Sequence, residues 1–115
     1  MTTISDFLDL FRQLEEVEII DHGRYSKLVV SGRGLGYLWE PTRTVGLKQT
    51  LAEQAALVAE RPDVFEVQFT AGGFGWVVVS LDGIEREELA ELLFEAWRLS
   101  APRRLVDQRG DRLPV

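Results

Sequence analysis

The sequence predicts an α+β domain whose antiparallel sheet of about five strands is covered on one face by the N- and C-terminal helices. Apolar residues recur at helical spacing near both ends of the chain, and short β-branched or aromatic segments joined by glycine-rich turns lie between them. The chain has 115 residues, 45% of them hydrophobic, which is enough for one buried core. Strands that follow one another through tight turns favour antiparallel pairing.

The first half of the chain predicts one amphipathic helix followed by short strands. Thr3 or Ser5 is available to cap that helix. A turn signal at residues 21–23 and a glycine-rich hairpin at residues 31–34 separate the strands, and Pro41 breaks the chain before the last of them. The expected elements are a helix over residues 4–16, a short strand or helix extension over 17–20, and strands over 25–31, 35–39 and 42–47.

The second half predicts a helix, a hairpin and a further helix. Thr50 and Glu53 fit a capping box at the start of the first helix, and Pro62 ends it. Its expected buried stripe consists of Leu51, Ala55, Val58 and Ala59. Strands are expected over 64–69 and 75–81, and the last helix over 85–100. We expect residues 1–105 to form the domain. Residues 106–115 should form a polar C-terminal tail that does not pack on the domain and remains a loose arm.

Composition argues against several classes of function. The chain has no cysteine and one histidine, which excludes disulfides and cysteine nucleophiles and argues against a transition-metal site. His22 and Ser26 lack a nucleophile elbow, and the Gly32–Gly36 segment lacks the lysine of a phosphate loop. We therefore predict no enzyme, cofactor or metal. The absence of a long apolar run and of a signal peptide predicts a cytoplasmic protein that does not enter membranes.

The charge distribution is uneven. The net charge of −6 argues against broad nucleic-acid binding, but residues 23–50 carry five basic residues and one acidic residue, and residues 98–115 carry five and two. If these stretches converged, their cations would form a phosphate-binding patch. The alternative is that the strand residues are simply solvated on outer strand faces. For Arg103 and Arg104 the alternative is that they compensate the negative C-terminal end of the last helix. The candidate residues are Arg24, Lys27, Arg33, Arg43, Lys48, Arg103 and Arg104.

The aromatic residues have two interpretations. They could stack unpaired bases, or they could pack in the core, and their strand and helix periodicity favours the core. Trp39, beside Glu40-Pro41, is the residue that periodicity assigns least firmly to the core. The residues concerned are Trp39, Phe65, Phe69, Phe74, Trp76, Phe94 and Trp97.

Residues from Arg61 onward resemble a known bacterial family. A strand with Gly75-Trp76-Val77 is followed by Leu81-Asp82-Gly83-Ile84, by the helical segment Glu88–Leu99, and by Ala101-Pro102-Arg103-Arg104-Leu105. This pattern resembles the MmcQ/YjbR family, and the resemblance covers roughly residues 4–105. It implies a fold like that of bacterial frataxin (CyaY) and a double wing of two hairpins that binds DNA. Glu85 stands where the family usually has an aspartate cap.

The resemblance and the charges leave three hypotheses. The first is a non-enzymatic DNA-binding protein that uses the basic hairpin. The second is a regulatory adaptor that binds another protein through its acidic helices or an exposed wing. The third, which the frataxin-like fold implies, is an acidic divalent-cation site at Glu87, Glu91 and Glu95, although such a face is ordinarily only solvated.

Overall fold

The computed structural model describes residues 1–115 and shows an α+β fold. The strands form one antiparallel sheet in the order β1-β2-β3-β4-β6-β5. The sheet has six strands rather than the expected five or so, because residues 17–21 pair with the next strand instead of extending the first helix. The elements are α1 (Ile4–Phe11), β1 (Val17–Asp21), β2 (Ser26–Val30), β3 (Arg33–Trp39), β4 (Thr44–Thr50), α2 (Leu51–Glu60), β5 (Phe65–Ala71), β6 (Phe74–Ser80), a 3-10 turn (Leu81–Gly83), α3 (Arg86–Ser100) and α4 (Arg103–Arg109).

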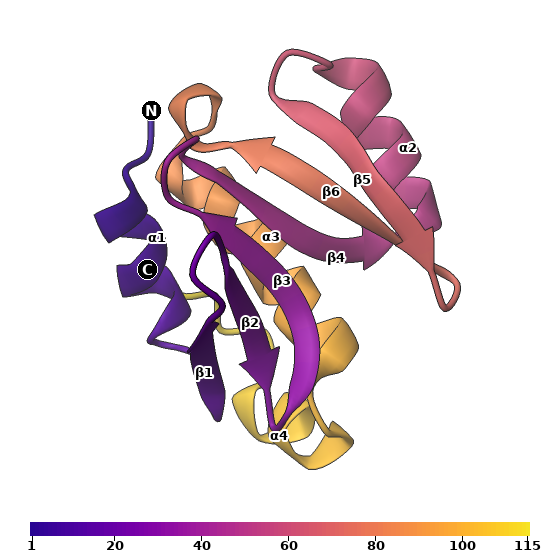
Figure 1. Ribbon diagram of the computed structural model, residues 1–115. Coiled ribbons are helices and arrows are strands. Elements are labelled where there is room, and N and C mark those ends of the chain that lie inside the picture. Colours follow the sequence, from indigo (N-terminus) through magenta and orange to yellow (C-terminus); the bar gives the residue numbers. More distant parts are fainter.

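The helices cover one face of the sheet, as predicted, and leave the other uncovered (Figure 1). α3 lies against β3 and β4, α2 lies against β4, β5 and β6, and α1 packs beside α3. Alternation along each strand sends Val45, Leu47 and Val77 into the core on the helix side. Side chains of the intervening residues project from the uncovered surface, which we call the open face.

Local signals explain where the first two helices begin. Thr3 caps α1 and forms a complete capping box with Asp6, and Thr50 caps α2 through the backbone N–H of Glu53. Glu85 precedes α3 without making a side-chain cap. The predicted buried stripe of α2 is wrong, because Leu51 is exposed and the buried residue of this helix is Gln54.

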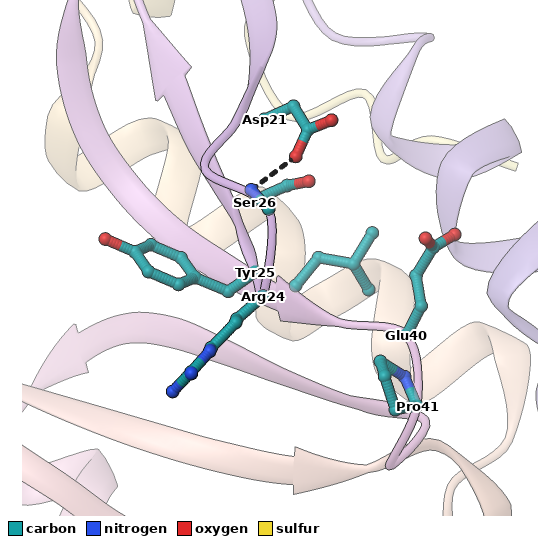
Figure 2. Close-up of a pocket in the computed structure, with 8 residues that line it drawn as sticks. Asp21, Arg24, Tyr25, Ser26, Glu40 and Pro41 are labelled. Atoms are coloured by element: carbon teal, nitrogen blue, oxygen red, sulfur yellow. Dashed lines mark hydrogen bonds between the residues drawn. The ribbon is translucent and has the colours of Figure 1, made fainter.

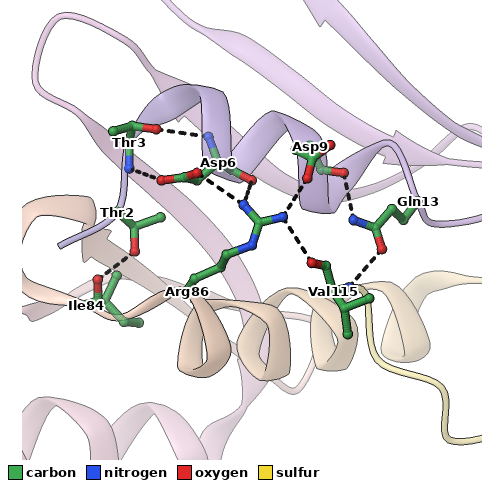
Figure 3. A network of polar contacts seen from close by, with 8 residues as sticks. All are labelled: Thr2, Thr3, Asp6, Asp9, Gln13, Ile84, Arg86 and Val115. Atoms are coloured by element: carbon green, nitrogen blue, oxygen red, sulfur yellow. Dashed lines mark hydrogen bonds and ion pairs between the residues drawn. The ribbon is translucent and has the colours of Figure 1, made fainter.

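The C-terminal segment is not a loose arm. Helix α4 crosses the expected boundary at residue 105, and the buried guanidinium of Arg109 donates to the carbonyls of Gln13 and Arg112 and to Glu15. Figure 3 shows Arg86 of α3 joining Asp6 and Asp9 of α1 to the carbonyl of Val115. Tertiary ion pairs and hydrogen bonds therefore order a segment whose composition alone predicts flexibility.

No helix combines the length and the hydropathy that crossing a bilayer requires.

Candidate nucleic-acid interface

Aromatic side chains form a continuous cluster on the open face. The ring of Tyr37 lies at its centre, with centroid distances of 5.9 Å to Tyr25, 5.8 Å to Trp39, 6.4 Å to Phe69 and 5.9 Å to Trp76. The rings of Phe69 and Trp76 are 5.2 Å apart across β5 and β6. We call these five residues the aromatic face.

Strand geometry accounts for this cluster. Tyr37 and Trp39 flank Leu38, so their rings share the open face while Leu38 enters the core. The register of β5 against β6 shifts between Val67 and Phe69, which leaves Gln68 as the extra residue of a bulge. The bulge directs Phe69 to the open face, although Val67 lies on the helix side.

Gly46 allows close packing at the base of the aromatic face. A Cβ at this position would collide with the side-chain oxygen of Gln68 and would lie 3.2 Å from the Trp39 ring. The two side chains therefore rest directly on the β4 backbone. Both Gln68 Oε1 and Trp76 Nε1 are buried without a hydrogen-bond partner.

Cations border the aromatic face. Lys48 Nζ lies 4.2 Å from the centroid of Phe74 and 6.0 Å from that of Trp76, which places this cation over two rings. Burial lowers the pKa of Lys48, and the positive charge of Arg33 lowers it further. The stem of Lys27 crosses over Gly34 on the same face.

Arg24 lies at the turn between β1 and β2, beside a shallow hollow (Figure 2). Arg24 and Tyr25 extend to one side of this turn and Glu40 to the other. His22 is a turn residue that stacks on Tyr25 at 5.1 Å. Because Asp21 and Glu40 also line the hollow, it is poorly suited to an anion, and Arg24 belongs instead to the border of the aromatic face.

The candidate cations separate into two groups. None of the ion pairs in the structure involves Arg24, Lys27, Arg33 or Lys48. The remaining candidates are paired and lie elsewhere: Arg43 with Asp82, Arg103 with Asp107, and Arg104 with Glu16. The two arginines of α4 follow α3 on the helix side, so the C-terminal basic stretch does not join the open face.

The aromatic candidates also separate. Phe65, Phe94 and Trp97 are buried as expected, and Trp97 Nε1 donates to the carbonyl of Glu15 at 3.0 Å. The expectation of core packing is wrong for Phe69, Phe74 and Trp76, which lie on the open face. Trp39, which periodicity assigns least firmly to the core, lies there as well. Sequence reasoning missed Tyr25 and Tyr37. The alternation Tyr37-Leu38-Trp39 was the signal that could have identified an aromatic strand face.

The acidic residues do not form a cation site. No group of three or more histidine, aspartate or glutamate side chains is placed to hold a metal ion. Both carboxylate oxygens of Glu95 accept hydrogen bonds from Arg98, so Glu95 is neutralised within its own helix. The hypothesis of a divalent-cation site along Glu87, Glu91 and Glu95 therefore has no geometric support.

Comparison with known proteins identifies the fold and the family. Uncharacterised proteins of Mycobacterium tuberculosis and Mycobacterium bovis are each 41% identical over 51 residues, which is 44% of this chain but only 40% of the relatives' own length. A crystal structure of protein DR2400 of Deinococcus radiodurans, described as a DUF419 domain, superposes with a TM-score of 0.77 at 18% identity. That match covers 94% of this chain and 88% of the other. The YjbR family model matches residues 12–99, from the end of α1 to the last turn of α3, and the chain therefore belongs to the YjbR family.

Proposed function

We propose that this YjbR protein is a non-enzymatic DNA-binding protein that contacts phosphates from the border of the open face. The observation that carries the proposal is the group of unpaired cations, Arg24, Lys27, Arg33 and Lys48, around an uncovered sheet surface. Arg43, Arg103 and Arg104, by contrast, already have carboxylate partners. Unpaired lysine and arginine side chains gain the most from phosphate, because no internal ion pair has to break first.

The net charge of −6 is compatible with this proposal because charge acts locally. At physiological ionic strength exposed charges are screened over about 8 Å, and the shortest dimension of the molecule is 26 Å. Acidic residues such as Glu87 and Glu91 on α3 lie on the helix side. On the open face, Glu18 and Glu66 lie on the edge strands β1 and β5.

The experiment compares variants that change the net charge equally. Lys27→Gln and Lys48→Gln remove cations from the open face, where these lysines pair with Tyr37 and Trp76 across the strands, whereas Arg103→Gln and Arg104→Gln remove them from α4. Fluorescence anisotropy of labelled duplex and single-stranded DNA is measured over a salt series that starts at about 20 mM, the concentration at which phosphate contacts are strongest. For the wild-type protein, log K should fall linearly with log salt.

Each open-face substitution should reduce the magnitude of the salt slope by about 0.7 to 0.9, the contribution of one phosphate contact, while the α4 substitutions leave it unchanged. Equal effects of the two pairs would contradict the assignment to the open face. If neither DNA form binds at about 20 mM salt, the DNA-binding proposal fails, and a protein partner becomes the function to test.

A further inference from the structure

The two hairpins that flank the centre of the sheet carry different chemistry. The hairpin of β2 and β3 contains Lys27 and Arg33. The hairpin of β5 and β6, residues 65–80, has no lysine or arginine and one acidic residue, Glu66. A wing that grips a duplex by its phosphates needs cations, so the second hairpin is unsuited to that task.

The second hairpin instead supplies rings. Phe69 and Trp76 belong to the aromatic face, and Phe74 lies beneath Lys48. The most accessible members of the aromatic face are at its two ends: Tyr25 is 36% exposed and Phe69 is 37% exposed. Tyr37, Trp39 and Trp76 between them are partly buried by one another.

We infer that the open face binds unpaired DNA, with bases stacked on the aromatic face and phosphates at the bordering cations; this inference rests on the proposed function. Bases in a duplex are already stacked on one another, so only unpaired bases can reach these rings. The unpaired cations favour a polyanion over an apolar protein surface as the occupant of this face. Aromatic rings on an uncovered sheet, with about two or three bases stacked on them, are an established way of holding single strands.

The test measures affinity for a fluorescein-labelled dT12 strand and for a twelve-base-pair duplex at equal salt. The protein should bind dT12 at least about tenfold more tightly, since stacking gives roughly 1–3 kcal/mol per base, equivalent to about 5- to 150-fold. Phe69→Leu keeps an apolar side chain but removes the ring, and it should weaken dT12 binding by at least about fivefold without weakening duplex binding.

Val67→Ala is the matched control. Val67 lies on the same strand and is 50% exposed, but it projects from the other side of the sheet. Its substitution should leave dT12 affinity unchanged. Circular dichroism and thermal melting establish that both variants fold, and Tyr25→Leu at the opposite end of the aromatic face provides a second loss of a ring should Phe69→Leu fail to fold.

The outcomes separate this inference from the proposed function. Preference for dT12 that depends on Phe69 or Tyr25 supports both. Duplex binding that equals or exceeds dT12 binding, or dT12 binding unaffected by both ring substitutions, overturns the stacking inference and leaves phosphate binding standing. If neither dT12 nor the duplex binds at about 20 mM salt, both the stacking inference and the proposed function are overturned. Stronger binding of rU12 than of dT12 overturns the assignment to DNA.

Discussion

Replacing Gln54 with glutamate removes the donor that fastens the strands of the aromatic face to α2. Gln54 is 6% exposed, and its Nε2 donates to the carbonyl of Phe69 at 3.1 Å and to that of Trp76 at 2.9 Å. A carboxylate at this position would present an acceptor to two acceptors. Two hydrogen bonds at about 1 kcal/mol each, together with the cost of the buried charge, predict a loss of about 3 kcal/mol at pH 7. This corresponds to a decrease in Tm of about 12 °C.

The pH dependence of Gln54→Glu tests the cause of this loss. Burial and the two carbonyls disfavour the charged form, so the folded-state pKa of the introduced carboxyl is raised above its unfolded value of about 4.3. A raised pKa contributes stability below the unfolded pKa that is lost as pH rises through the folded pKa. Urea unfolding should therefore give a smaller deficit relative to wild type at pH 5 than at pH 7. Gln54→Leu, which also lacks donors but cannot ionise, should show a deficit independent of pH. A pH-independent deficit in Gln54→Glu would show that the buried charge does not cause the loss of stability.

Three further predictions concern the fold. Gly36→Ala should cost about 3 kcal/mol in urea unfolding, because its Cβ would collide with the backbone carbonyl oxygen of Gly46; a cost below that of Gly46→Ala, whose Cβ meets the flexible end of Gln68, would contradict this. Arg109→Met should cost about 3 kcal/mol, since it removes three donated hydrogen bonds from a side chain that is 6% exposed, whereas Arg103→Met at an exposed ion pair should change stability by less than about 0.5 kcal/mol. Hydrogen bonds from Arg43 lower the pKa of Asp82. This carboxylate therefore contributes stability above its unfolded pKa of about 3.9, and that stability is lost as pH falls through the lower folded pKa. Asp82→Asn should reduce the acid dependence of the urea unfolding midpoint, and an unchanged pH profile would count against this prediction.

The sequence predicts the fold well where local chemistry sets it. The threonine caps at residues 3 and 50 and the breaks at Pro62 and Pro102 give element boundaries within a few residues of those observed. The packing of α2 against β5 and β6 could not be predicted from such local signals. Hydrophobic periodicity ranks glutamine as an outward residue, yet Gln54 is buried because its amide satisfies carbonyls on two strands.

The candidate site was predicted in part. The cations at Arg24, Lys27, Arg33 and Lys48 lie in the basic stretch that the sequence indicates, but the pairing of Arg104 with Glu16 depends on a contact across 88 residues. The aromatic face depends on which side of the sheet remains uncovered and on the bulge at Gln68. The uncovered side is set by helices distant in the chain, and the bulge is set by the pairing of β5 with β6, so the hydrophobic periodicity of a single strand shows neither feature.

The three tryptophan indoles provide the most direct test of the open face as the DNA-binding surface. In 1H–15N NMR spectra each indole N–H gives its own signal, and dT12 is titrated into labelled protein at low salt. If the open face binds DNA, the signals of Trp39 and Trp76 shift, while that of Trp97, which donates to the carbonyl of Glu15 in the core, stays in place. Binding that leaves the Trp39 and Trp76 signals unmoved, with shifts confined to amides of α2, α3 or α4, would contradict it.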